Sequence, residues 1–283
     1  MPASTGFLFN RSNIGLVTNN GLEISLGAAL IDNNDLSWNT SLFYSKNENK
    51  IEELIDGLDK FVYNTTSDGN LTVGATKGGS IGDMYGRVFT GETDAGGLPL
   101  GSAGATELLG NAQPDFLAGW SNTIKYKDFS MSFLIDARIG GQIYSQTSAD
   151  LDRYGVSERS LQYRDTGITV SGTNTGSGSA NTESISSEEY WTSMSEISGN
   201  YVYDQDNIRF RELSIGYNVP NVSSIGLESA NIQLVGRNLF FFSKSAEDID
   251  PEAMLGTTIG VQGMSHNAMP TLRSLGLNLT LNF

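Results

Sequence analysis

Large apolar residues alternate with small or polar residues in seven segments of the chain. In the clearest segment every second residue from Leu275 to Phe283 is large and apolar, and the residues between them are small or polar. Successive side chains of a β-strand point to opposite faces, so this pattern predicts a strand with one apolar and one polar face. Related patterns predict six further strands, at residues 21–31, 36–47, 117–126, 129–139, 207–219 and 230–239.

Short and long connections alternate between these predicted strands. Residues 32–35, 127–128 and 221–228 are short connections, whereas 48–116, 140–206 and 240–270 are long. Compact soluble domains rarely contain loops without secondary structure longer than about 12–15 residues. Transmembrane barrels have short periplasmic turns and long extracellular loops. The alternation therefore predicts an all-β fold, an antiparallel up-and-down transmembrane β-barrel segment of about seven strands. Residues 84–90 form one possible additional strand in the first long connection.

The two faces of the predicted sheet allow two interpretations. In a membrane barrel the apolar face meets lipid and the polar face lines a watery lumen, whereas in a soluble sandwich the apolar face meets a core. Asp136 and Arg138 lie on the polar face of their strand, which both interpretations allow. In the barrel, one set of residues lies on the convex side: Leu213, Ile215, Tyr217, Ile232, Leu234, Leu275, Leu277 and Leu279. A second set lies on the concave side: Ser214, Asn218, Gln233, Asn278 and Thr280.

Composition excludes several classes of function. The 283 residues carry a net charge of −15, which argues against nucleic-acid binding because that requires a basic surface. The chain has no cysteine and one histidine, His266, so thiolate or histidine-cluster metal sites are excluded and a conventional catalytic triad is not expected. We therefore expect no enzyme, cofactor or metal site. The acidic residues Glu247, Asp248, Asp250 and Glu252 match no calcium loop, and we expect a solvated acidic loop there.

Seven strands do not close a bacterial barrel, which has an even number of strands and starts at about eight. We therefore expect residues 1–283 to be the C-terminal part of a larger barrel, without its plug domain and N-terminal strands. Plugged outer-membrane transporters have about 22 strands.

Several stretches resemble SusC/RagA-type TonB-dependent outer-membrane transporters of Bacteroidetes. The stretches are N-I-G-L-V-T-N-N-G-L-E-I at 13–24, W-N-T-S-L-F-Y-S-K-N-E-N-K-I at 38–51, P-D-F-L-A-G-W-S-N-T at 114–123, G-G-Q-I-Y-S-Q-T at 140–147, Y-V-Y-D at 201–204, I-R-F-R-E-L-S-I-G-Y-N-V-P at 208–220, G-R-N-L-F at 236–240, D-P-E at 250–252 and P-T-L-R-S-L-G-L-N-L-T-L-N-F at 270–283. Their order and spacing cover nearly the whole chain.

The resemblance implies a location in the cell outer membrane and a part in uptake of oligosaccharides or peptides. It also implies a SusD-like surface lipoprotein as a lid, and contact with TonB through a region outside this chain. The alternative is a soluble β-rich glycan-binding module without transport activity. Detergent-free fractionation distinguishes the two, because only the soluble module stays in buffer.

Aromatic residues supply the remaining site predictions. Tyr190, Trp191, Tyr201 and Tyr203 cluster in the second long connection, where they are candidates for stacking on a substrate or for stabilising the loop. Trp38, Tyr44, Trp120 and Tyr126 are expected in aromatic girdles at the membrane interfaces. Phe283, Leu281 and Leu279 are expected to form the signal that barrel-assembly machinery reads by strand addition, and to face outer-membrane lipid after folding.

Overall fold

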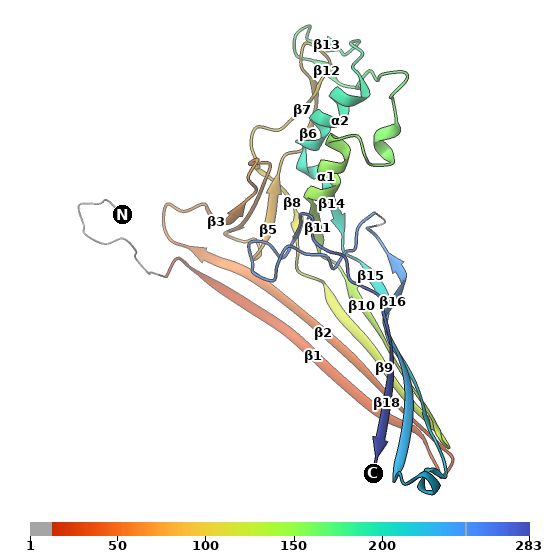
Figure 1. Ribbon diagram of the computed structural model, residues 1–283. Helices are drawn as coiled ribbons and strands as arrows, with labels where there is room; N and C mark the ends of the chain where they lie inside the picture. The colour runs from red at the N-terminus through yellow and green to blue at the C-terminus, as the bar shows by residue number, and fades with distance from the viewer. Residues whose placement is uncertain (1–12, 247) are drawn as a thin grey trace, which may run out of the picture.

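The computed structural model, which describes residues 13–246 and 248–283, contains one long curved sheet with a loop domain at one end (Figure 1). The long sheet has seven strands in the order β1-β2-β9-β10-β15-β16-β18, and every neighbouring pair is antiparallel. The strands are β1 Gly15–Asp32, β2 Leu36–Leu54, β9 Phe116–Tyr126, β10 Phe129–Ile139, β15 Asn207–Asn218, β16 Ser229–Lys244 and β18 Ser274–Asn282. The prediction of an up-and-down transmembrane barrel segment is therefore confirmed. The described sheet is open, since β1 and β18 each have one neighbour within it.

Short turns join the strands at the end away from the loop domain. Between β1 and β2, the side chain of Asn33 accepts hydrogen bonds from the backbone amides of Asp35 and Leu36. Between β9 and β10, Lys127 adopts a positive φ of 52°. A short 3₁₀ turn at Val222–Ile225 lies between β15 and β16. Near these turns the strands begin and end close to the predicted residues, because the residues that form a tight turn are adjacent in the sequence.

Strand register assigns each side chain to one of two faces, because directly paired residues point to the same side. Ile215 pairs with Met131 on one side and Leu234 on the other, and Leu234 pairs with Leu277. Leu234 is 59% exposed and Leu277 is 66% exposed, so these side chains do not converge on a shared core. We call this uncovered apolar face the outer face.

The opposite, inner face carries the predicted polar residues. Asn218 pairs with Asn231, which pairs with Thr280, and Gln233 pairs with Asn278. Asn231 Nδ2 donates to Asn218 Oδ1 at 2.7 Å. The division into two faces agrees with the barrel interpretation and is inconsistent with the soluble sandwich, in which the aliphatic residues would be buried.

The strands have the length that a membrane requires. β9 contains 11 residues, which corresponds to about 33 Å along the strand at roughly 3.3 Å per residue. With a tilt of about 45°, such a strand spans about 23 Å, close to the apolar band of about 25 Å in outer-membrane barrels. β1, β2 and β16 are longer than predicted.

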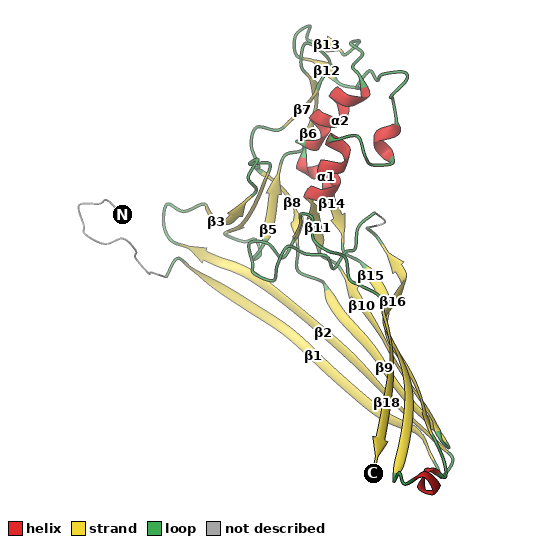
Figure 2. Ribbon diagram, in the orientation of Figure 1, coloured by secondary structure: helices red, strands yellow, loops and turns green. Residues whose placement is uncertain are grey.

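The three long connections are not structureless, and that expectation is wrong. They contain three further sheets, with the orders β3-β4-β5-β8, β13-β12-β6-β7 and β14-β11-β17, and two α-helices (Figure 2). The strands are β3 Lys60–Thr65, β4 Leu71–Thr76, β5 Asp83–Gly86, β6 Phe89–Thr93, β7 Pro99–Gly101, β8 Glu107–Asn111, β11 Gln142–Ser145, β12 Thr173–Asn174, β13 Ser179–Ala180, β14 Val202–Asp204 and β17 Met264–Ser265. The helices are α1 Gln146–Arg153 and α2 Ser187–Ser195.

A common core unites these connections into one loop domain. The buried residues Leu71, Val73, Met84, Tyr144, Tyr201 and Met264 belong to one cluster, and they come from all three connections. Two sheets also combine connections, since β6 pairs in parallel with β12 and β11 pairs in parallel with β17. The possible strand at 84–90 is divided between β5 and β6 and does not join the long sheet.

Neither of the described α-helices is long and apolar enough to cross a membrane. Each begins with a serine cap. Ser145 Oγ accepts from the amide of Ser148, and Ser186 forms a reciprocal capping box with Glu189. Such caps satisfy backbone donors that the helix itself cannot satisfy.

Candidate functional site

Aromatic side chains form two rows on the outer face, one near each end of the strands. The lower row lies beside the short turns, where Phe129 pairs with Tyr126 and its ring lies 4.6 Å from that of Tyr217. The upper row lies toward the loop domain and contains Tyr44, Phe116, Phe210, Phe240 and Phe242. Apolar residues fill the surface between the rows. This arrangement matches the aromatic girdles that flank the lipid-facing band of outer-membrane barrels.

The two tryptophans expected in the girdles lie between the rows. Trp38 Nε1 donates to Asn122 Oδ1 at 2.9 Å, and Trp120 Nε1 donates to Thr40 Oγ1 at 2.9 Å. Asn122 is 1% exposed. The indole rings therefore cover two polar side chains on the outer face, so that lipid meets aromatic surface at this position.

A network of five charged residues and one threonine lies on the inner face, and we call it the clasp: Asp136, Arg209, Arg211, Asp250, Glu252 and Thr271. Arg211 donates from Nη1 and Nη2 to Glu252, at 2.9 and 2.5 Å, and from Nε and Nη2 to Asp136, at 2.8 and 2.6 Å. Arg209 Nη1 donates to Glu252 at 2.7 Å. The clasp attaches the third long connection to strands β10 and β15.

The acidic residues of the third connection are therefore not a solvated loop, and that expectation is wrong for Asp250 and Glu252. Asp250 accepts hydrogen bonds from Thr271 N at 2.8 Å, from Thr271 Oγ1 at 2.5 Å and from the amide of Glu252 at 3.0 Å. Burial raises the pKa of Asp250, but these hydrogen bonds and the nearby Arg209 outweigh it, and the pKa lies below its ordinary value. Glu247 lies outside the described residues.

A β-bulge positions the central arginine of the clasp. The pairing of β15 shifts between Phe210 and Glu212, both against β10 and against β16. Relative to β10, Arg211 is the additional residue in β15, and its guanidinium reaches both acidic partners. The sequence displays both the I-R-F-R-E segment and the D-P-E segment, but not the bulge that brings them together.

The predicted loop aromatics lie around a buried ion pair in the loop domain. Asp152, whose side chain is 0% exposed, pairs with Arg159 at 2.5 Å and accepts from Tyr201 Oη at 2.9 Å. The guanidinium of Arg159 lies 4.9 Å from the ring centre of Tyr201 and 5.5 Å from that of Trp191. Burial raises the pKa of Tyr201, so its hydroxyl remains a donor. Trp191 and Tyr201 are thus internal supports of this domain.

The other two predicted aromatics are half-buried and reach the surface of the loop domain. The ring of Tyr190 lies 5.0 Å from that of Trp191. Tyr203 lines a hollow of about 610 Å³ together with Arg159, Gln162 and Leu161. Ligand pockets commonly have volumes of about 300–1,000 Å³. Tyr203 is therefore placed at a cavity of the loop domain.

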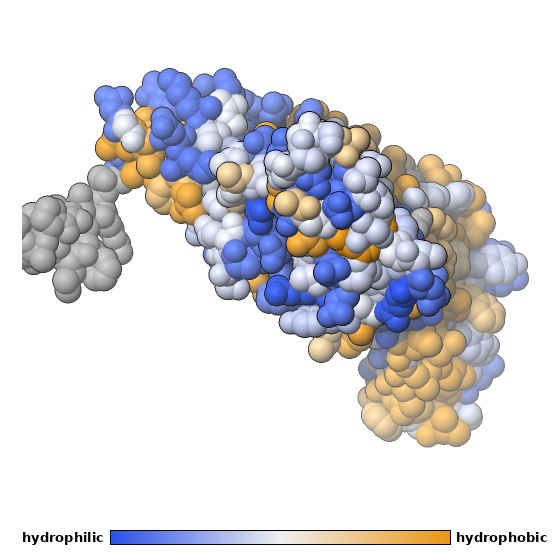
Figure 3. All heavy atoms as spheres, turned by 90° about the horizontal axis from the view of Figure 1, so that it is seen from above, coloured by the Kyte–Doolittle hydropathy of each residue, from blue (hydrophilic) through white to orange (hydrophobic). Residues whose placement is uncertain are grey.

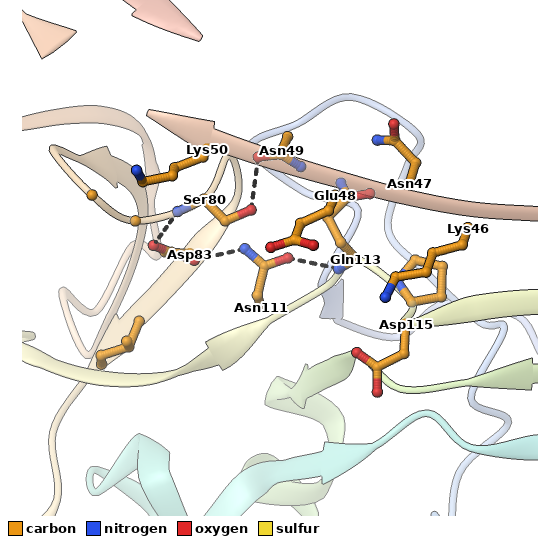
Figure 4. Close-up of a pocket in the computed structure, with 14 residues that line it drawn as sticks. Lys46, Asn47, Glu48, Asn49, Lys50, Ser80, Asp83, Asn111, Gln113 and Asp115 are labelled. Atoms are coloured by element: carbon orange, nitrogen blue, oxygen red, sulfur yellow. Dashed lines mark hydrogen bonds between the residues drawn. The ribbon is translucent and has the colours of Figure 1, made fainter. Parts of the chain in front are cut away.

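A second hollow, of about 550 Å³, lies between the upper end of β2 and the segment that joins β8 to β9 (Figure 4). Its polar wall is held by hydrogen bonds, in which Ser80 Oγ donates to Asn49 at 2.7 Å and Asn111 Nδ2 donates to Asp83 at 2.7 Å. Glu48 and Lys46 of β2 also line it.

Viewed from above, the loop domain is mainly hydrophilic, and a large hydrophobic patch lies at one side of the view (Figure 3).

The predicted assembly residues lie at the free edge of the sheet. Leu279 pairs with Ile232 and Leu281 pairs with Ala230, and they are 61% and 40% exposed. Phe283 follows the end of β18 and is 85% exposed. All three remain accessible to a partner strand or to lipid, and their role in assembly remains a proposal.

Comparisons with known proteins agree with this arrangement. No family model matches the sequence. The TonB-dependent receptor P3 of Formosa agariphila is 26% identical over 100% of this chain and 30% of its own length. The TonB-dependent receptor SusC of Bacteroides thetaiotaomicron is 26% identical over 51% of this chain and 16% of its own. The chain resembles SusC/RagA-type TonB-dependent transporters.

A solved structure agrees at the level of fold. The structure of the RagAB peptide transporter matches with a TM-score of 0.68 and 18% identity, over 100% of this chain and 31% of that chain. The chain thus spans about a third of the length of the relatives that it matches throughout. It forms part of the wall of an outer-membrane β-barrel, with the outer face toward lipid and the inner face toward the lumen.

Proposed function

We propose that this chain is the C-terminal part of a TonB-dependent receptor that imports oligosaccharides or peptides across the outer membrane. One observation carries the proposal, namely that the chain is similar over its whole length to a TonB-dependent receptor. The two-faced wall supports it, since the outer face is apolar and the inner face is polar and charged. The relatives are named as receptors and a transporter, which favours uptake over an enzymatic reaction.

The proposal includes several partners. A SusD-like surface lipoprotein would close the barrel over the loop domain, and TonB would act through a region outside this chain. Barrel-assembly machinery would recognise Phe283, Leu281 and Leu279 during insertion. Among the loop aromatics, Tyr190 and Tyr203 are the candidates for contact with substrate or lid, because Trp191 and Tyr201 are buried.

Deletion of the gene region for residues 13–283 in the source organism tests the proposal. We expect the intact protein to require detergent for extraction from the outer membrane and to copurify with a surface lipoprotein. We expect the deletion to abolish uptake of one class within a panel of labelled oligosaccharides and peptides, and an intact copy of the gene to restore it. A protonophore should abolish the same uptake, since TonB-dependent import is energised.

Two results would overturn the proposal. Recovery of the intact protein in buffer without detergent would favour the soluble glycan-binding module. Unchanged uptake of every labelled solute in the deletion strain would contradict a role in import.

A further inference from the structure

Arg138 differs from the other two arginines on the upper inner face, because it has no carboxylate partner within the described residues. Arg209 and Arg211 each form ion pairs with Glu252, and Arg211 also pairs with Asp136. Arg138 Nη2 donates only to neutral acceptors, the carbonyl of Ala112 and Gln205 Oε1 at 2.8 Å.

The charge of Arg138 is only partly solvated. The residue is half-buried, and its Nε is buried without a hydrogen-bond partner among the described residues. Glu252 acts on Arg138 only at a distance, since Arg209 and Arg211 bind its two oxygens. A charge removed from water costs free energy unless an opposite charge or hydrogen bonds compensate it. The position therefore favours an anionic partner.

A hollow of about 310 Å³ lies beside Arg138 on the inner face. Strands β2 and β9 contribute Ser45 and Leu117 to its wall, and the third connection contributes Met254 and Gln262. No acidic residue in the described part of the chain lines this hollow, although acidic residues are the majority among the charged residues of the sequence. One cation, several amides and an apolar wall make a site that attracts anions.

Gln262 lines the same hollow, but its side-chain nitrogen does not face it. Its Nε2 is buried and has no hydrogen-bond partner among the described residues. A buried donor without a partner costs about 1–3 kcal/mol, so such groups usually have one. Because Gln262 Nε2 is buried beside Gly82, which does not line the hollow, the donors offered to the hollow are those of Arg138.

Arg138 is held in a fixed position by its neutral partners. The chain turns at Gly140 and Gly141, which have positive φ values of 79° and 83°. The turn brings Gln205 toward β10, and Gln205, which is 0% exposed, connects Arg138 to the carbonyl of Pro251. A preorganised guanidinium loses little side-chain entropy on binding a carboxylate.

We propose that this hollow, which we call the Arg138 site, binds a carboxylate group of the solute that the receptor imports. The guanidinium supplies the charge and the hydrogen-bond donors. Uronic acids of an oligosaccharide and acidic side chains of a peptide both present this group. The inference rests on the proposed function and narrows its substrate class to solutes that carry carboxylates.

Calorimetric titration of the purified, detergent-solubilised protein tests this proposal. The probes are a galacturonate trimer and its methyl ester, and the tetrapeptides Ala-Ala-Glu-Ala and Ala-Ala-Gln-Ala with blocked ends. We expect at least one acidic probe to bind roughly 10- to 100-fold more tightly than its neutral counterpart, which is the range that a charged hydrogen bond provides. Preference for the trimer identifies a saccharide, and preference for the peptide identifies a peptide.

Three variants complete the test. Arg138→Met should remove the preference for the acidic probe, and Arg138→Lys, which keeps the positive charge, should retain a preference for it. Arg237→Met is the matched control, because Arg237 is a 65% exposed arginine paired with Glu212 away from this hollow, and it should change binding less than twofold. Arg138→Lys and the comparison of acidic and neutral probes on the wild-type protein remain informative if Arg138→Met does not fold.

The inference is overturned if neither acidic probe is preferred by the wild-type protein, or if Arg138→Met retains the preference. These outcomes are independent of the proposed function, because binding in micelles requires neither TonB nor a lipoprotein. Carboxylate binding without any uptake in cells would contradict the proposed import and leave the Arg138 site intact.

Discussion

Glu252 binds both arginines of the clasp. The substitution Glu252→Gln removes the negative charge of this side chain and preserves its shape. In the structure Glu252 accepts from Arg209 at 2.7 Å and from Arg211 at 2.9 and 2.5 Å. The side chain of Arg209 is 3% exposed and that of Arg211 is 25% exposed. The substitution therefore leaves a buried guanidinium without its carboxylate.

The expected cost lies between those of buried and exposed ion pairs. Removal of one partner of a buried pair costs about 3–5 kcal/mol, whereas exposed pairs contribute about 0–1 kcal/mol. The side chain of Glu252 is 23% exposed, and Arg211 retains Asp136. We therefore expect a cost of about 2–3 kcal/mol, which corresponds to roughly a 30- to 150-fold increase in the released form of residues 248–271.

Hydrogen exchange of the purified protein in detergent measures this release. The amides of Thr271 and Glu252 both donate to Asp250, so they should exchange roughly 30- to 150-fold faster in Glu252→Gln. Glu212→Gln is the control, because its pair with Arg237 is 3.2 Å long and exposed, and it should accelerate exchange at most about fivefold.

Two outcomes would refute the reasoning about the clasp. Equal exchange in the two variants would mean that the ion pairs do not hold the third connection. Equal acceleration in the strands of the long sheet would mean that the substitution unfolds the wall rather than releasing one segment.

Three further predictions concern the two faces, the terminal aromatic and pH. Phe133→Arg, in the middle of the outer face, should cost about 2–4 kcal/mol in a lipid-facing position, whereas Ser132→Arg on the inner face should cost far less; the folded fraction on heat-modifiability gels compares the two. Phe283→Asp should lower the amount of surface-exposed protein at equal synthesis, because Phe283 ends the strand that the assembly machinery would recognise. Burial of one ring contributes only about 1.5–3 kcal/mol to stability, so loss of stability alone would not explain such a defect. Equal surface levels of the variant and the wild type would contradict this role. The folded-state pKa of Asp250 is below its ordinary value, so the contribution of Asp250 to stability is present above about pH 4 and is lost as pH falls further. The rate of pepsin cleavage in the third connection, relative to that of an unfolded reference peptide, should therefore rise from pH 4 to pH 2.

The long strands could be predicted from the sequence because each has a different environment on its two faces. In the segment from Leu275 to Phe283, lipid and lumen impose opposite polarity on successive residues, so that the alternation is visible without knowledge of partners. The lengths of the connections then predicted the order of the strands in the sheet, since strands joined by a short turn pair with each other.

The loop domain could not be predicted in the same way. The first five residues of β4, 71–75, are all buried, so buried and exposed positions do not alternate along that strand. Its core also depends on residues far apart in the chain, among them Tyr144, Tyr201 and Met264. Pairings such as β6 with β12 join different connections, and no local pattern indicates them.

The candidate site could be predicted only in part, because its contacts also join residues that are far apart in the chain. Tyr190, Trp191, Tyr201 and Tyr203 do lie near one another, but two of them surround Arg159 in the interior. The acidic residues of the third connection find partners on β10 and β15, which composition cannot reveal. The prediction of a solvated loop failed because it considered the charges without the wall that faces them.

The bulge at Arg211 reverses the phase of the alternation within a single strand. Below it the odd-numbered Leu213 and Ile215 face lipid, and above it the even-numbered Phe210 does, with its ring 5.3 Å from that of Phe240. Removal of Arg211 alone would restore a uniform period of two and would leave Phe210 toward lipid and Arg209 toward the lumen, because Phe210 and Glu212 already pair with the consecutive residues Ile135 and Leu134. A change of one residue elsewhere in this strand, without a compensating bulge, would instead exchange the two faces of every residue beyond it.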